Sequence, residues 1–214
     1  MSPRRQTAGT LGIVAGVALA VLFILYFTSG ATPATFNDPA KALEFFRAQS
    51  GRNEVIACLA ILTVSTAAVF VAGLASALAG RTPTRATATL YFGLGGLAGH
   101  ALSAFIILAA APWLVKTAAG DQVAAAHAYV AINGLSMASD SLGNFFVGLS
   151  TLFAGWAITA TPGFGSALGW FGIVTGIVNA VAGLVMNVSA LFLVSFLLPI
   201  VWLIWAGNTL RRMA

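Results

Sequence analysis

The chain has 214 residues, of which 59% are hydrophobic and only 7% are charged, and its mean hydropathy is +0.96. A soluble domain carries about 25% charged residues, so this composition excludes a soluble cytosolic enzyme. The net charge is +5, and the single cysteine, Cys58, excludes an intrachain disulfide and a cysteine-rich metal site.

Six apolar stretches approach or exceed the roughly 20 residues that a helix needs to cross a bilayer core. The alternating pattern of a β-barrel is absent, so helices are the only way to pair the backbone polar groups in lipid. We therefore predict an all-α, polytopic transmembrane helical bundle that forms one domain over residues 1–214. The predicted spans are residues 9–28, 55–79, 87–114, 141–160, 167–186 and 190–206.

The basic residues predict the orientation of these spans, because cytoplasmic loops are enriched in lysine and arginine. With six spans, one side collects six arginines and no acidic residue, whereas the other side mixes both charges. We expect the acid-free side, and therefore both termini, to be cytoplasmic in a bacterial inner membrane. The arginines on that side are Arg4, Arg5, Arg81, Arg85, Arg211 and Arg212. We interpret them as topological anchors and expect no nucleic-acid partner.

The first span has a competing interpretation as a cleaved signal peptide. Arg4 and Arg5 precede an apolar run, and Ser29-Gly30-Ala31 resembles a cleavage site with small residues. The run is longer than the 7–15 residues of a signal-peptide core, which favours a retained span. Cleavage would leave five spans and an external N-terminus.

The first outer connection contains a predicted amphipathic helix over residues 39–49. Asp38 can cap it and Pro39 suits the first helical position. Leu43, Phe45 and Phe46 would lie on the outer membrane surface or seal the loop onto the bundle. A lid over a substrate is a further option.

The second outer connection is ambiguous over residues 122–139. This stretch is rich in alanine but carries His127, Tyr129 and Asn133, which makes it too polar for the bilayer centre. We read it as an outer extension of the fourth helix, with a segment that folds back as the alternative.

Small residues predict where helices pack closely. In the fifth span, five glycines and Ala180 recur in steps of three and four and form one helical face, inside one bundle or across a homo-oligomer. The glycines are Gly165, Gly169, Gly172, Gly176 and Gly183, and the pairs Gly12/Gly16 and Gly95/Gly99 repeat the spacing more weakly. Trp202 and Trp205 near one end of the last span, and Trp113 near the outer end of the third, suit aromatic belts at the interfaces.

Few polar residues lie at membrane depth, and such residues are functional candidates because they are expensive to bury there. His100, Asp140, Asn144 and Asn179 all fall in the outer half by our estimate, whereas the inner half is apolar. One hypothesis is an outward-facing pocket for a ligand, an ion or a proton. The alternative is structural: His100 bonds a carbonyl, Asp140 caps the fourth helix and the asparagines bridge helices.

The sequence offers no cofactor or catalytic centre. Haem b is disfavoured because His100 and His127 are the only histidines and fall at different depths. Zinc requires three or four ligands, and only His100 and Asp140 are expected to be close. No nucleotide fingerprint and no serine or cysteine nucleophile beside a base stands out.

Three glycine-and-aromatic segments carry a resemblance to a known family: NFFVGL at residues 144–149, ALGWFGI at 167–173 and VWLIWAG at 201–207. Together with the span order and the long first outer loop, the whole chain resembles an uncharacterised bacterial family of six-helix membrane proteins, a domain of unknown function. The resemblance implies an architecture and no activity, cofactor or site.

These observations favour a non-enzymatic binding or accessory role in the lipid bilayer, either housing a hydrophobic ligand or lipid or supporting a larger membrane complex. A small transporter or proton-coupled permease is the alternative. It is weakened by the lack of charged residues in the inner half and of a clear inverted repeat. A membrane enzyme is the third reading.

Overall fold

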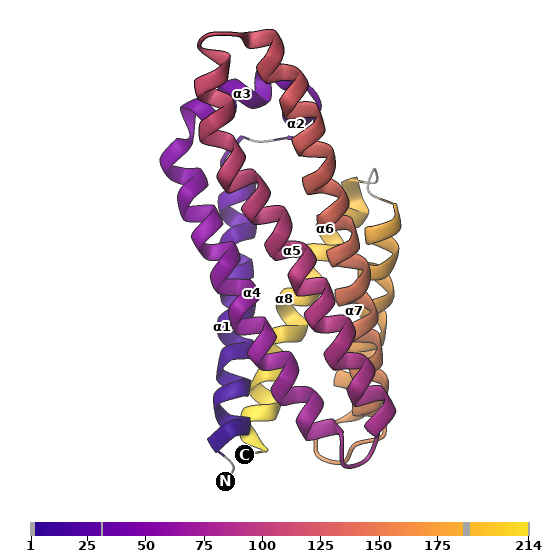
Figure 1. Ribbon diagram of the computed structural model, residues 1–214. Helices are drawn as coiled ribbons and strands as arrows, with labels where there is room; N and C mark the ends of the chain where they lie inside the picture. The colour runs from indigo at the N-terminus through magenta and orange to yellow at the C-terminus, as the bar shows by residue number, and fades with distance from the viewer. Residues whose placement is uncertain (1–2, 31, 186–188, 214) are drawn as a thin grey trace.

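The computed structural model describes residues 3–30, 32–185 and 189–213, and these residues form eight helices (Figure 1). The connection between the last two spans falls on residues 186–188, outside the described residues. The helices are α1 (Pro3–Thr28), α2 (Pro33–Asn37), α3 (Pro39–Ala48), α4 (Ser50–Leu78), α5 (Pro83–Ala118), α6 (Gln122–Thr159), α7 (Ser166–Leu184) and α8 (Ser189–Arg212).

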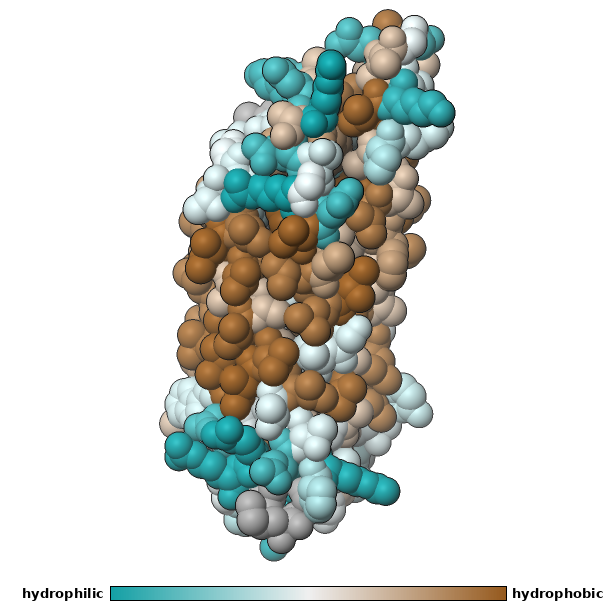
Figure 2. Space-filling model, turned by 90° about the vertical axis from the view of Figure 1, so that its left-hand side faces the viewer, coloured by the Kyte–Doolittle hydropathy of each residue, from teal (hydrophilic) through white to brown (hydrophobic). Residues whose placement is uncertain are grey.

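Six helices, namely α1 and α4 to α8, are long and apolar enough to cross a membrane, which confirms the predicted all-α fold and the six spans. A continuous apolar band separates two hydrophilic ends of the molecule in Figure 2. The α5 and α6 helices extend well beyond this requirement, with 36 and 38 residues. A bilayer core takes about 20 helical residues, so the outer parts of both helices form a projection beyond it.

The six spans pack in a closed ring in chain order. Each span contacts the next, from α1 and α4 through α5, α6 and α7 to α8, and α8 returns to pack along α1. The described ends of the chain lie at the same end of the bundle as the α4–α5 and α6–α7 connections (Figure 1). This arrangement gathers the acid-free set of arginines at one end, as the charge pattern requires.

The opposite end carries a cap made by α2 and α3. The apolar face of α3, with Ala42, Leu43 and Phe46 at most 6% exposed, packs with Leu114 and Tyr129 of the α5–α6 projection. The Tyr129 hydroxyl donates a hydrogen bond of 2.7 Å to the carbonyl of Phe36. The α3 helix therefore seals the first outer loop onto the bundle. Residues 122–139 continue α6 without folding back.

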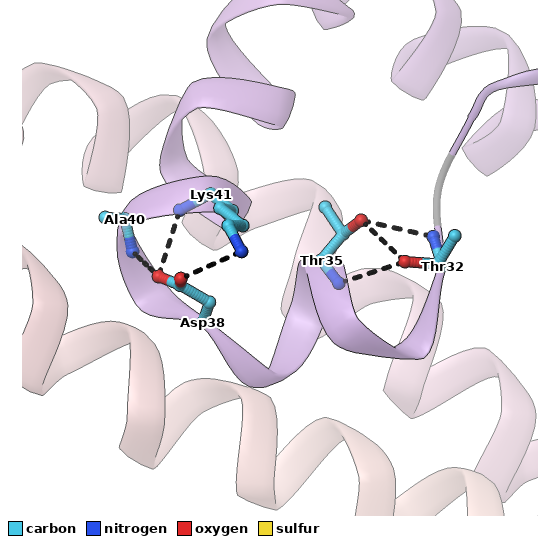
Figure 3. A network of polar contacts seen from close by, with 5 residues as sticks. All are labelled: Thr32, Thr35, Asp38, Ala40 and Lys41. Carbon is cyan, nitrogen blue, oxygen red and sulfur yellow. Dashed lines mark hydrogen bonds and ion pairs between the residues drawn. The ribbon is translucent and has the colours of Figure 1, made fainter.

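The start of α3 depends on Asp38, whose Oδ1 accepts hydrogen bonds from the amides of Ala40 at 3.0 Å and Lys41 at 3.3 Å (Figure 3). The Lys41 amide, helped by the Ala40 amide and the Lys41 charge, lowers the pKa of this exposed carboxyl. The Asp38 carboxylate stabilises the fold fully at pH values above the ordinary aspartate pKa of about 3.9. This stabilisation is lost as the pH falls through the lowered pKa of Asp38.

We therefore expect the α3 amides to lose protection from hydrogen exchange when the pH falls from neutrality to about 3, after correction for intrinsic rates. In Asp38→Asn, which keeps a capping oxygen but cannot titrate, this pH dependence should disappear. A wild-type protection pattern that is unchanged at low pH would contradict the role of the carboxylate.

The glycine face of α7 packs directly on α6. A Cβ at Gly176 would lie 2.6 Å from the carbonyl oxygen of Gly148, and one at Gly183 would lie 2.6 Å from the amide of Phe145. Gly169 and Gly172 approach Gly155 in the same way. Backbone contacts this close exclude any side chain, so these glycines set the distance between the two helices.

Gly165 does not belong to this face, contrary to the sequence-based expectation. It precedes α7 with a φ of 82°, and a Cβ there would have no atom within 4 Å. Its spacing from Gly169 matches the stripe, but its role is to turn the chain in a conformation that side chains rarely adopt.

Toward the arginine-rich end, the ring is filled by an apolar cluster. Six of its members are at most 4% exposed: Phe70, Leu74, Leu78, Ile158, Leu168 and Trp202. The rings of Phe70 and Trp202 meet edge to face with centroids 5.8 Å apart. The placement of Trp202 in an interfacial belt was wrong, because its side chain turns into the ring instead of toward lipid. Trp205 and Trp113 remain exposed, at 41% and 52%.

Candidate functional site

The ionisable pair singled out in the sequence is joined in the structure. His100 lies on α5 and Asp140 on α6, and the His100 Nδ1 and Asp140 Oδ1 atoms are 2.7 Å apart. Glycines bring the two helices together at this level: a Cβ at Gly143 would lie 3.0 Å from His100 Nδ1, and one at Gly99 would lie 2.8 Å from the carbonyl oxygen of Ser139. The pair therefore depends on small residues on both helices.

Asn144 completes a three-residue cluster. Its Nδ2 lies 3.5 Å from Asp140 Oδ2, one helical turn further along α6. The two oxygens of Asp140 thus face different partners. The side chains of His100 and Asp140 remain 26% and 37% exposed, so the pair is accessible to a bound molecule.

The cluster lies on the face of α6 that is directed into the ring. Gly143, Val147 and Ser150 of α6 pack toward α5, whereas Phe145 and Gly148 pack toward α7. Between these two contact faces lies a third face, carrying Asp140, Asn144, Thr151 and Ile158. Thr151 and Ile158 are 6% and 1% exposed, which identifies this face as the interior one.

Asn179 is not bonded to this cluster. It lies on α7, is 2% exposed, and its Oδ1 has no hydrogen-bond partner within the described part of the chain. Because Gly148 packs between Gly176 and Ala180, Asn179 stands level with the turn of α6 that follows Asn144. Counting about 1.5 Å per residue places it about 6 Å deeper in the bundle than Asn144.

Serine hydroxyls fix the α5–α6 contact on both sides of the pair, and these residues were not singled out from the sequence. The Ser103 and Ser136 oxygens are 2.9 Å apart, and the Ser150 hydroxyl donates to the carbonyl of Thr89 at 2.7 Å. Ser103 follows His100 by three residues and Ser136 precedes Asp140 by four. This matched helical spacing is the signal that would have identified Ser103 and Ser136.

The described residues contain no group of three histidine, cysteine, aspartate or glutamate side chains that could hold a metal ion. His127 lies 13 residues before Asp140 on α6, about 20 Å along the helix, and is therefore far from His100.

A separate cavity of about 360 Å³ opens at the arginine-rich end and is lined by Arg81, Thr82, Pro83, Thr84, Arg85 and Ala160. The Arg85 guanidinium lies 3.8 Å above the centre of the Trp156 ring and donates to the Trp156 carbonyl at 3.2 Å. Arg85 therefore fixes the start of α5 against α6.

No protein-family model matches the chain, and no curated protein or solved structure shows significant similarity to it. These comparisons therefore identify no family for the chain, and they do not support the resemblance drawn from the three glycine-and-aromatic segments.

Proposed function

We propose that this polytopic membrane protein is a non-catalytic binding protein of a bacterial cytoplasmic membrane, acting alone, as a homo-oligomer or as an accessory subunit. Its ligand is a hydrophobic small molecule or lipid with a polar group that meets His100 and Asp140. The observation that supports this is the partly exposed pair at 2.7 Å, set among glycine-rich helices that are otherwise apolar. Asn144 and Asn179 extend the polar lining.

Gentle extraction followed by native mass spectrometry tests the proposal. We expect a retained small molecule or lipid in the wild type, and its loss in both His100→Ala and Asp140→Asn. The pair is partly exposed, so one lost hydrogen bond to the ligand costs about 0.5–1.5 kcal/mol, which corresponds to a roughly 2- to 13-fold weaker affinity.

The matched controls are His127→Ala and Glu44→Gln, which change the same residue type or charge at exposed positions outside the site. The proposal would be contradicted if both site variants fold poorly while the folded fraction of each still retains the small molecule or lipid. The pair would then have a structural role. A co-purifying protein in place of a small molecule would favour the accessory role.

A proton-coupled permease is the second candidate, and the His100–Asp140 pair is the observation that favours it. Ionisable side chains that pair inside the spans of membrane proteins are typical of proton pathways. The apolar filling of the inner half argues against a permease, because a permease requires a polar path to both sides of the membrane. Proton flux into proteoliposomes that is abolished by Asp140→Asn would establish the permease over the binding protein.

The orientation is tested by placing single cysteines in a Cys58→Ser background. Ser50 and Thr84 are exposed residues at opposite ends of the bundle. We expect an impermeant thiol reagent to label Ser50→Cys in intact cells and Thr84→Cys only after permeabilisation, because the arginine-rich end faces the cytoplasm. Labelling of Thr84→Cys in intact cells would reverse the orientation.

A further inference from the structure

Buried polar groups that lack a protein partner gather in the interior of the ring. Within the described residues, the Oγ1 of Thr175, the Oδ1 of Asn179 and the Nε1 of Trp202 form no hydrogen bond, although these residues are only 0%, 2% and 4% exposed. The fourth such atom, Nε of Arg52, belongs to a side chain that already binds the end of α1. An unpaired buried polar atom costs about 1–3 kcal/mol, so three on facing helices require an explanation.

Three other buried threonines in the spans bond to their own helices. Thr63, Thr66 and Thr89 each donate to a carbonyl one turn back, over 2.8, 2.7 and 2.9 Å. Thr175 is equally buried and helical, yet its hydroxyl makes no such bond within the described part of the chain. The side chain of Thr175 is therefore oriented for a partner that the protein does not supply.

The three atoms follow one another along the interior face of α7. The Nε1 of Trp202 lies beside Gly172, at 2.6 Å from the position of a Cβ there. Thr175 follows Gly172 by three residues and Asn179 follows Thr175 by four, which corresponds to steps of about 4.5 Å and about 6 Å. Asn144 of α6 stands about 6 Å beyond Asn179. Within the described residues, none of the three unpaired atoms forms a hydrogen bond with its neighbour in this series.

A bridging water spans about 5.5 Å, since each of its two hydrogen bonds measures about 2.8 Å. The unpaired atoms are buried and lie at successive turns of one face, and an internal water binds two to four polar partners. We infer that ordered water molecules occupy the interior of the ring from the His100–Asp140 pair down to Trp202, bonded to Asn144, Asn179, Thr175 and the Trp202 indole. This hydrated path does not depend on the ligand proposed above.

The path ends at Trp202. Inward of the indole, Phe70, Leu74, Ile158 and Leu168 are at most 1% exposed and offer no polar side chain. Water therefore reaches from the capped end to the level of Gly172 and no further. The protein gains a polar interior on one side of the bilayer while the other side remains closed.

The test is magnetisation transfer from water to the Trp202 indole N–H, measured by NMR in micelles on protein with 15N-labelled tryptophan. The signal is assigned with Trp202→Phe or, if that variant does not fold, by replacing Trp113, Trp156, Trp170 and Trp205 in turn, all of which are exposed. We expect transfer from water in the wild type and a severalfold reduction in Thr175→Val, which removes the neighbouring hydroxyl at nearly constant shape.

The matched control is Thr66→Val, whose hydroxyl is bonded to its own helix and which should leave the Trp202 signal unchanged. The midpoint of thermal unfolding gives a second readout with opposite signs. If water is bound, Thr175→Val removes one of the water's hydrogen-bond partners, and the unfolding midpoint falls. If the interior is dry, the same substitution removes an unpaired buried hydroxyl, and the unfolding midpoint rises. A Trp202 N–H that receives no magnetisation from water overturns the inference, whatever the midpoints show.

Discussion

Gly176→Leu is expected to be among the most destabilising single substitutions in this protein. The new Cβ would overlap the amide of Leu152 and lie 2.6 Å from the carbonyl oxygen of Gly148. Overpacking costs about 1–3 kcal/mol when side chains can adjust. Both neighbours here are backbone atoms, so α6 and α7 must separate, and we expect a loss of at least about 3 kcal/mol. Denaturant unfolding in detergent micelles measures this loss directly, and Gly172→Leu should behave similarly.

Two controls separate packing from helix propensity. Val174→Leu enlarges a lipid-facing side chain of α7 that is 51% exposed, and it should change stability very little. Gly134→Ala adds a Cβ in open space on α6 and should be neutral or slightly stabilising, since alanine favours helix over glycine. Similar losses for Gly176→Leu and Val174→Leu would remove the case for a tight α6–α7 contact.

The second large effect is expected for Phe70→Ala, because Phe70 of α4 is 0% exposed and packs against Gly12 of α1 and Trp202 of α8. In soluble cores, truncation of phenylalanine to alanine costs about 3–5 kcal/mol. Lipid is as apolar as the bundle interior, so only the lost packing counts here, and we expect about 2–4 kcal/mol. Phe105→Ala, at a position that is 52% exposed, should cost far less in the same unfolding experiment.

A compensating variant makes this prediction sharper. A Cβ at Gly12 would lie 2.5 Å from the Phe70 ring, so Gly12→Val alone should clash and destabilise. In the Phe70→Ala background, the same valine points into the space that the ring leaves and should restore part of the stability. Additive losses in the double variant would show that Gly12 and Phe70 do not pack as described.

The spans could be predicted because their signal is local: a run of apolar residues of bilayer length specifies a helix without reference to its neighbours. The start of α3 could also be predicted, since Asp38 is a capping residue and Pro39 suits the first turn of a helix. The relation between helices was harder. The glycines of α7 indicated a close contact but not with which helix, and α6 is identified only by the approach of Gly148 and Gly155.

The candidate site shows the same limit. His100 and Asp140 were paired because few other ionisable groups lie at membrane depth, and elimination sufficed. The belt placement of Trp202 was wrong because the rise per residue gives the depth of a side chain but not its direction around the helix. That direction is fixed by neighbours: α7 turns Asn179 inward because its glycines face α6, and α8 turns Trp202 inward because Gly207 packs on α1.

The contact between the first and last helices has a consequence for how the chain is made. Gly9 packs against the backbone of Gly207, and Gly16 against Ile200 and Ile204, so one side of α1 is complete only when α8 is present. Chains fold from the N-terminus as they are synthesised. During insertion, the glycine face of α1 is therefore open to lipid until α8 has been synthesised. A chain that stops before α8 would leave this face of α1 uncovered, and we expect it to be less stable than the chain that includes α8.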